Sequence, residues 1–407
     1  MTPVRTDIAP RSRPTLPDSG IPGGWEPAAL MLATLLLLGF GLVNLYSASA
    51  FLAARQELPD SFYVLRQATG AAVGLVLLAV AARIPYTWWR TLAWPLLVGV
   101  FGALLLTVLP FTTGIAPEIN GARRWLNLGV TLQPAEFAKI AIIVWTAHMA
   151  VKKRARFRSL SQGLMPFLVV WSILLVPILL QPDLSTAFVL ALLGALVVFG
   201  AGARIGHFVF LAICMAPLAW IQLGTGFRAE RLRAFGNLDQ YAGAAGYQVR
   251  QSLIALGSGG PTGVGFGEGR QKFGFLPEPH NDFIFSMIGE EWGFLGTAGL
   301  LLAYLAIVVI GFRIARRAPD LFGQLLALGF TNLIALHALL HAAVGLGVIP
   351  PTGLPLPLVS YGRSHLLVTL VGMGVLLSVA RGDPSARPEP EGELPDAAIS
   401  DPARAHV

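Results

Sequence analysis

The chain has 407 residues, of which 55% are hydrophobic and 13% are charged, and its mean hydropathy is +0.66. Soluble globular domains carry roughly 25% charged residues, so this composition excludes an ordinary soluble fold. The formal net charge of +7 comes from short basic clusters between apolar runs, which is typical of the loops of a membrane protein and not of a nucleic-acid-binding surface.

Ten apolar runs are long enough to cross a bilayer, for which about 20 residues are needed. They lie at 26–50, 65–83, 91–110, 134–151, 164–181, 184–202, 206–223, 283–312, 321–347 and 357–380. The fourth run is unusual because it carries Glu136 and Lys139. The sequence therefore predicts an all-α, polytopic membrane protein with about ten transmembrane helices.

Basic residues in alternate loops orient these helices, because Lys and Arg are enriched on the cytoplasmic side. The residues that mark this side are Arg83, Arg90, Lys152, Lys153, Arg204, Arg313, Arg316, Arg317 and Arg381. Both termini are predicted to be cytoplasmic, and 224–282 becomes a long extracytoplasmic loop between the seventh and eighth helices. Residues 1–24 and 382–407 are expected to be disordered segments that flank a membrane domain of residues 25–381.

The segment 246–296 combines many glycines with Glu278, His280 and Asp282, in a chain that is otherwise mostly apolar. A membrane protein keeps irregular, charged backbone only where it is buried in protein or faces water. Asp282 directly precedes the eighth apolar run, where a carboxylate could act as a general base or cap the helix N-terminus. We predict that this segment is the reaction centre.

Arg123 and Arg124 lie on the predicted outer side, against the distribution expected for basic residues. They fit a phosphate site, because guanidinium groups bind phosphate oxygens in a bidentate way, or an interfacial pair. Lys139 lies one turn after Glu136 inside the membrane, where an ionisable side chain costs about 2.5–3.5 kcal/mol and often has a function. A purely structural Glu136–Lys139 pair remains an alternative.

Further polar residues are predicted on the same outer side. Asp183 follows Gln181-Pro182 at the start of the sixth run, which is a normal helix-start signal. Ser360 lies in a proline-rich loop before the last run, where a rigid turn is the simplest interpretation and no adjacent base would make it a nucleophile. A second outer basic cluster comprises Arg228, Arg231, Arg233 and Arg250.

Seven segments, spread from the third run to the tenth, resemble the SEDS family of bacterial cell-wall synthesis, typified by RodA and FtsW. They are NGARRW (120–125), LQPAEFAK (132–139), QPDLSTA (181–187), GYQVRQSLIALGSGG (246–260), LPEPHNDFIF (276–285), GEEWGFLG (289–296) and TGLPLPLVSYG (352–362). The chain departs from the family pattern after Gly362, where Arg363-Ser364-His365 replaces the usual Gly-Ser, and at His341, where asparagine is common.

The resemblance implies a peptidoglycan glycosyltransferase of the bacterial cytoplasmic membrane, which polymerises lipid II into β-1,4-linked glycan for cell elongation or division. It implies Asp282 as the catalytic residue and a polar cavity for pyrophosphate and sugar. The residues expected to bind substrate are Arg123, Arg124, Glu136, Lys139, Asp183, Arg231, His280 and Ser360. The implied partner is a class B penicillin-binding protein, which supplies transpeptidation.

Two other functions would also use a charged, irregular segment in a membrane protein. A lipid II flippase would explain charges within the membrane and a broken helix, and a non-catalytic scaffold would only position a partner. The suspect charges gather on one face rather than at the midplane, and no inverted repeat is evident, which favours the enzyme. The sequence establishes no cofactor: a divalent cation could help to neutralise the pyrophosphate, but no cluster of ligands indicates a metal site.

Overall fold

The computed structural model describes residues 24–119, 121–127, 129–154, 157, 160–209, 213, 235 and 244–382. Its α-helices are α1 (Trp25–Arg55), α2 (Phe62–Arg83), α3 (Trp88–Val108), α4 (Pro134–Lys153), α5 (Met165–Leu180), α6 (Leu184–Gly200), α9 (Ala244–Gly259), α10 (Ile284–Arg317), α11 (Leu321–Gly345) and α12 (Arg363–Arg381). The smaller elements are a 3₁₀ turn (Pro110–Thr112), a π-helical turn (Leu160–Leu164) and an antiparallel hairpin of β1 (Leu126–Asn127) and β2 (Thr131–Leu132).

Eight helical spans of the described residues are long and apolar enough to cross a membrane; the fifth, Ser161–Leu180, joins the π-helical turn to α5. Helix α6 is a shorter apolar helix of 17 residues. The prediction of an all-α, polytopic membrane protein is therefore confirmed. Nine of the ten predicted runs correspond to helices, and the predicted run at 206–223 lies largely outside the described residues. The last helix begins at Arg363 rather than 357, because two prolines and the left-handed Leu358 (φ +66°) keep the preceding residues out of helical conformation.

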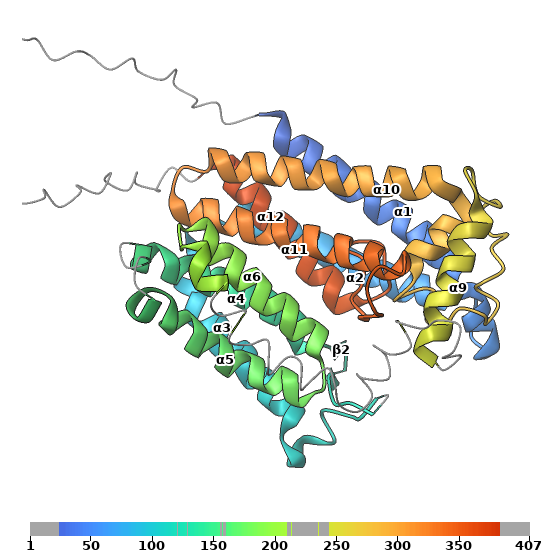
Figure 1. The fold of residues 1–407 in the computed structure, drawn as a ribbon, viewed down its shortest axis with the longest axis horizontal. Coiled ribbons are helices and arrows are strands. Elements are labelled where there is room, and N and C mark those ends of the chain that lie inside the picture. Colours follow the sequence, from blue (N-terminus) through green and yellow to red (C-terminus); the bar gives the residue numbers. More distant parts are fainter. Residues whose placement is uncertain are drawn as a thin grey trace, which may run out of the picture.

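Helices α4 and α12 form the centre of the bundle, and they are the most buried of the membrane-crossing helices. Helix α12 packs along α2 and against α4, while α1 and α10 lie side by side along one edge and α3 and α5 lie at the other (Figure 1). The outer helices α1, α2, α3 and α10 expose many leucine and valine side chains. Such surfaces suit contact with lipid chains, so the bundle presents an apolar perimeter.

The residues that mark the predicted cytoplasmic side meet at one end of the bundle. Arg313, near the end of α10, forms an ion pair with Glu26 at the start of α1 (3.3 Å). At the same end of the helices, Arg381 Nη2 of α12 donates to the carbonyl oxygen of Arg83 in α2 (2.8 Å). Asp282 lies two residues before α10, and the 24 residues of α10 after a break at Gly293, about 36 Å of helix, lead from that break to this charged end.

Helix α10 is interrupted at Gly293, whose φ of +66° and ψ of −162° are not helical. The loop that follows α9 enters at this interruption. The Phe294 amide donates to the Gly260 carbonyl (2.8 Å), and the Val264 amide donates to the Glu290 carbonyl (3.0 Å). The loop thus satisfies backbone groups that the broken helix would leave unpaired, which is a requirement at membrane depth.

Glycine is required where this loop and α10 approach each other. A Cβ atom on Gly293 would lie 2.3 Å from the Gly263 nitrogen, and one on Gly259 would lie 1.9 Å from the Gly289 oxygen. Both distances are far below van der Waals contact, so no larger residue fits without a shift of the backbone. This close approach accounts for much of the glycine-rich pattern in 257–296.

The described part of the long outer segment is not irregular throughout. Helix α9 occupies 244–259, and it buries Val249, Ser252 and Ala255 at helical spacing. This helix is not predicted from the sequence, because it is short and carries polar residues and so does not resemble a membrane-crossing run. Residues 1–23 and 383–407 lie outside the described residues, and the domain boundaries stay a prediction.

Candidate active site

Asp282 lies in a tight turn directly before α10. The amides of Asn281 and Asp282 both donate to the Glu278 carbonyl oxygen, at 3.2 and 3.1 Å. Glu278 has a φ of +49°, a left-handed conformation that is strained for a residue with a side chain. Asp282 is partly exposed, and a Cβ atom on Gly353 would lie 3.8 Å from its Oδ2. The loop before α12 therefore passes beside the carboxylate.

Ser360 fastens this loop (350–362) to the Asp282 turn. Its hydroxyl donates to the Asn281 carbonyl (2.8 Å) and accepts from the Leu356 amide (2.9 Å). The Ser360 carbonyl accepts from Nε2 of Gln67 in α2 (3.0 Å). Ser360 is 2% exposed. Its side chain therefore stabilises a rigid turn and is not open to solvent.

His280 packs between two tyrosine rings beside the same turn. Its ring centroid lies 5.1 Å from that of Tyr63 and 5.5 Å from that of Tyr361. Burial lowers the pKa of His280 to about 4, so the imidazole is neutral at physiological pH. The neighbouring Glu278 side chain is 54% exposed, and its Oε2 lies 3.8 Å from His280 Nε2. Partial desolvation raises the pKa of this carboxyl.

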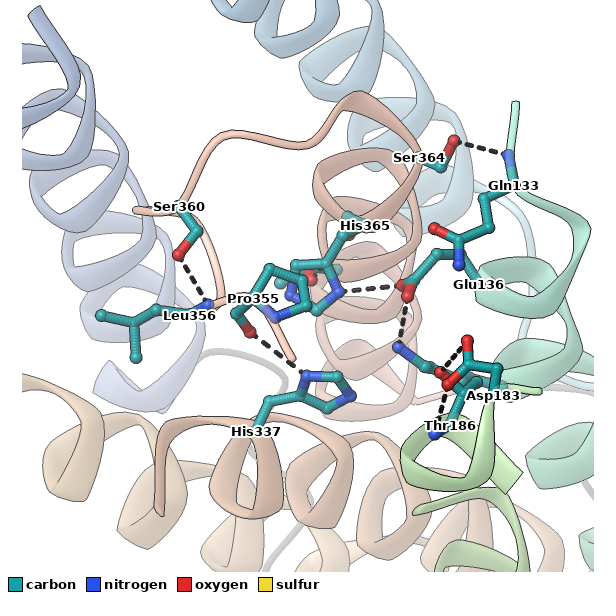
Figure 2. A network of polar contacts seen from close by, with 12 residues as sticks. Gln133, Glu136, Asp183, Thr186, His337, Pro355, Leu356, Ser360, Ser364 and His365 are labelled. Atoms are coloured by element: carbon teal, nitrogen blue, oxygen red, sulfur yellow. Dashed lines mark hydrogen bonds and ion pairs between the residues drawn. The ribbon is translucent and has the colours of Figure 1, made fainter. Parts of the chain in front are cut away.

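Glu136 and Lys139 form the ion pair that their spacing predicts, with Lys139 Nζ 2.7 Å from Glu136 Oε1. The other carboxylate oxygen, Oε2, contacts Nδ1 of His365 in α12 at 2.9 Å (Figure 2). Glu136 is 3% exposed and Lys139 is fully buried. Both residues were expected to bind substrate, and in this structure the packing of α4 and α12 separates them from solvent.

Arg123 and Arg124 both bind backbone carbonyl groups. Arg123 Nε donates to the Ala116 carbonyl (3.1 Å) and its Nη2 donates to the Leu109 carbonyl (2.9 Å). Arg124 donates through Nε to the Gln181 carbonyl and through Nη2 to that of Pro182, both at 3.1 Å. The two arginines therefore hold the segment around Ala116 and the turn before α6, and in each of them these bonds use Nε and Nη2.

A cavity of about 220 Å³ opens beside these arginines. Its lining residues include Glu118, Gly121, Arg123, Gln181 and Pro182. The lining combines the acid Glu118 with Arg123 and Gln181, which suits a polar ligand better than an apolar one.

Asp183 and Arg231 were the two remaining residues predicted to bind substrate. Asp183 caps α6, because its Oδ1 accepts from the Thr186 amide (3.1 Å) and its Oδ2 accepts from the Thr186 hydroxyl (2.9 Å). This is the helix-start role that its sequence context indicates. Arg231 lies outside the described residues, as do Arg228 and Arg233, while Arg250 lies on α9.

The structure adds a buried anchor for the glycine-rich loop. Lys272 Nζ contacts Glu291 Oε1 of α10 and the Ser47 hydroxyl of α1, both at 2.8 Å. The neighbouring Glu290 carboxylate accepts from the Arg270 amide (2.8 Å). The sequence predicts no role for Lys272 and no pairing with Glu291, and its only signal is the presence of Glu290 and Glu291 within an apolar helix. In the part of the chain that the structure describes, no three His, Cys, Asp or Glu side chains are placed to hold a metal ion.

Comparison with known proteins gives consistent matches over most of the chain. Residues 28–384 match the family model for cell cycle proteins of the FtsW, RodA and SpoVE type. A probable peptidoglycan glycosyltransferase FtsW from Trichlorobacter lovleyi is 41% identical over 355 residues, which cover 87% of this chain and 92% of the relative. Stage V sporulation protein E from Bacillus subtilis is 39% identical over 355 residues, covering 86% and 96%.

Solved structures show the same fold. A chain from a peptidoglycan synthase complex, studied for its coordination of polymerization and crosslinking, superposes with a TM-score of 0.73 at 30% identity. That match covers 86% of this chain and 96% of the other. The rod shape determining protein RodA of Thermus thermophilus matches with a TM-score of 0.64 at 29% identity, covering 88% and 96%.

Proposed function

Since this chain belongs to the family of FtsW, RodA and SpoVE, matched over residues 28–384, we propose that it is a peptidoglycan glycosyltransferase of the bacterial cytoplasmic membrane. Relatives that match nearly their whole length are named for this activity. The proposed donor is lipid II or a growing glycan chain, with undecaprenyl pyrophosphate as the leaving group. The acceptor offers a GlcNAc 4-hydroxyl, and the product is a β-1,4-linked glycan for elongation or division.

The position of Asp282 carries this proposal. It is a partly exposed carboxylate on a turn that is held by α10 on one side and by loop 350–362 on the other. Asp282 takes the proton of the 4-hydroxyl as that oxygen attacks C1 of the donor sugar, and the configuration at C1 inverts. A rigid turn keeps the base aligned, and the neutral His280 beside it adds no cation that would weaken its basicity.

Arg123 and Arg124 are the proposed groups for the departing pyrophosphate. Their Nε and Nη2 atoms are committed to backbone carbonyls, which fixes both guanidinium planes, and Arg123 lines the polar cavity. Fixed positive charge near a leaving group stabilises the charge that develops in the transition state. We propose that Glu136 and Lys139 contribute to catalysis as a buried ion pair and not by contact with the substrate, because neither side chain reaches solvent in this structure. No step is assigned to a divalent cation.

The proposed partner is a class B penicillin-binding protein, which would crosslink the new glycan. The similarity to a chain of a complex that coordinates polymerization and crosslinking supports this. Co-purification of the tagged chain from its own bacterium, followed by identification of bound penicillin-labelled proteins, tests the partnership. Recovery of no such protein under conditions that preserve the complex would contradict it.

The catalytic proposal is tested with purified protein, or its partner complex, and labelled lipid II in detergent. The wild type is expected to make long glycan chains, and a folded Asp282→Asn variant to make at least about 100-fold less. Glu268→Gln is the matched control, because Glu268 is an exposed acid in the same glycine-rich segment. Polymer from Asp282→Asn at the wild-type rate would remove Asp282 as the base. Translocation of lipid II across vesicles without polymer would favour the flippase.

A further inference from the structure

His365 is bonded to the buried pair of α4. Both oxygens of Glu136 are engaged, Oε1 by the Lys139 ammonium at 2.7 Å and Oε2 by His365 Nδ1 at 2.9 Å (Figure 2). A carboxylate held by an ammonium is ionised and can only accept, so Nδ1 of His365 carries the hydrogen and donates. His365 is 4% exposed. It therefore fixes the plane of the Glu136 carboxylate and ties the start of α12 to α4.

A second histidine continues from His365 toward the proline-rich loop. The ring centroids of His337 and His365 lie 4.7 Å apart. His337 Nδ1 donates to the Pro355 carbonyl at 3.2 Å, and one helical turn later in α11 His341 Nδ1 donates to the Leu354 carbonyl at 2.8 Å. A carbonyl oxygen only accepts, so both Nδ1 atoms carry hydrogen. Both histidines are at most 1% exposed.

The same loop ends on the Asp282 turn. Directly after Pro355, the Leu356 amide donates to the Ser360 hydroxyl, which itself donates to the Asn281 carbonyl. Asn281 is the residue before Asp282. A path of hydrogen bonds and one ring contact therefore runs from α4 through two histidine rings and the loop to the turn that holds the proposed base. Figure 2 shows its residues from Glu136 to Ser360.

We propose that His365 and His337 are positioning residues, which link the Glu136–Lys139 pair to the turn of Asp282. The proposal deepens the function proposed above and rests on it, since its endpoint is the base of that reaction. The hydrogen bonds of this path are buried and directional, so the loss of one partner leaves an unsatisfied group, and the two histidine rings are joined by packing. A change in the buried pair is thereby transmitted to the orientation of the carboxylate without contact between Lys139 and the substrate.

The bonding atom distinguishes this link from simple packing. All three histidines bond through Nδ1, while no hydrogen-bond partner in the described structure meets Nε2 of His337, His341 or His365. The amide nitrogen of asparagine takes the place of Nδ1, whereas that of glutamine takes the place of Nε2. Asparagine at 337 should therefore preserve the hydrogen bond to the Pro355 carbonyl, which anchors the loop, although it removes the ring contact with His365; glutamine or leucine should break that bond.

The test compares His337→Asn, His337→Gln and His337→Leu by steady-state polymerisation and by hydrogen exchange of the peptide 276–283. The leucine and glutamine variants are expected to lose at least about tenfold in kcat with KM changed by less than about twofold, because a small misplacement of a catalytic group has this effect. Their exchange in 276–283 should rise. His337→Asn should restore most of kcat and the slow exchange. His148→Leu is the control, because His148 is half-buried on α4 twelve residues beyond Glu136.

Three results would overturn the link. They are an increase in KM with kcat unchanged, equal activity of the asparagine and glutamine variants, and unchanged exchange of 276–283 in His337→Leu. If His337→Leu fails to fold, the asparagine and glutamine pair decides the question alone. An inactive wild type would contradict the proposed function. Hydrogen exchange requires no turnover, so the exchange pattern would still test the link in that case.

Discussion

The amide of Tyr361 donates to the carbonyl oxygen of His280 across 3.0 Å, which joins two segments 81 residues apart in the chain. The bond lies next to the Ser360–Asn281 contact, so the loop before α12 holds the Asp282 turn at two consecutive residues. Each contact has a neutral donor and acceptor in a partly buried site, where one hydrogen bond contributes about 1 kcal/mol. Together they define the position of a side chain that neither of them touches.

Ser360→Ala is expected to lower the free energy of unfolding by about 1–3 kcal/mol, because it leaves the buried Leu356 amide without its acceptor. It should also lower kcat more than it changes KM. Thermal unfolding in detergent and polymerisation kinetics measure both effects. Ser258→Ala is the control, since Ser258 is exposed and donates only within α9. Equal stability of the two variants would show that Ser360 does not fasten the loop.

His280 should make the protein less stable in mild acid. Burial lowers its pKa from 6.5 to about 4 in the folded protein, so between these values the unfolded chain binds more protons than the folded one. The stabilisation is complete above pH 6.5 and is lost as pH falls toward 4, by up to about 3 kcal/mol. The fall in melting temperature over this range should therefore be smaller in His280→Phe.

The Glu278→Gln variant is the control for this pH dependence, and it should shift the acid sensitivity of stability in the opposite direction to His280→Phe. Partial desolvation raises the pKa of the Glu278 carboxyl, so this group favours the folded state at low pH and opposes it as pH rises, an effect that solvent weakens because the side chain is 54% exposed. Its removal should make the acid-dependent loss of stability steeper than in the wild type. A His280→Phe variant with the wild-type pH dependence would show that another group is responsible.

Lys272→Met should destabilise the glycine-rich loop by about 3–5 kcal/mol, because it leaves the buried Glu291 carboxylate without its cation. The double variant Lys272→Met with Glu291→Gln should recover much of this loss, since no uncompensated charge remains. Limited proteolysis of residues 260–276 and thermal unfolding report on the loop and on the whole bundle. A double variant less stable than the single one would contradict the assignment of a buried ion pair.

Glu278→Gly should raise the free energy of unfolding by about 0.5–1 kcal/mol, because glycine removes left-handed strain of about 1–2 kcal/mol and adds chain entropy to the unfolded state. Glu268→Gly, at an exposed position whose φ is not left-handed, should instead destabilise the protein. The comparison of the two melting temperatures checks the strain at Glu278 directly. A loss of stability in both variants would refute it.

The sequence identifies what is local and misses what depends on distant partners. Apolar length places the membrane-crossing helices, and the spacing of Glu136 and Lys139 predicts their ion pair. His365 lies 229 residues from Glu136, so no local sequence pattern predicts their contact. The departure from the family motif after Gly362 only shows that residue 365 is unusual. The carbonyl groups that bind Arg123 and Arg124 are equally invisible, because they depend on how two connecting segments fold back.

The interruption of α10 at Gly293 constrains any attempt to exchange parts between this protein and its relatives. The loop from Gly260 to Val264 completes the hydrogen bonding of the two halves of that helix, and its glycines fit only against this backbone. A chimera that replaces either piece alone would leave unpaired amides inside the bilayer. Residues 259–296, which include the turn of Asp282, must therefore be exchanged as one unit.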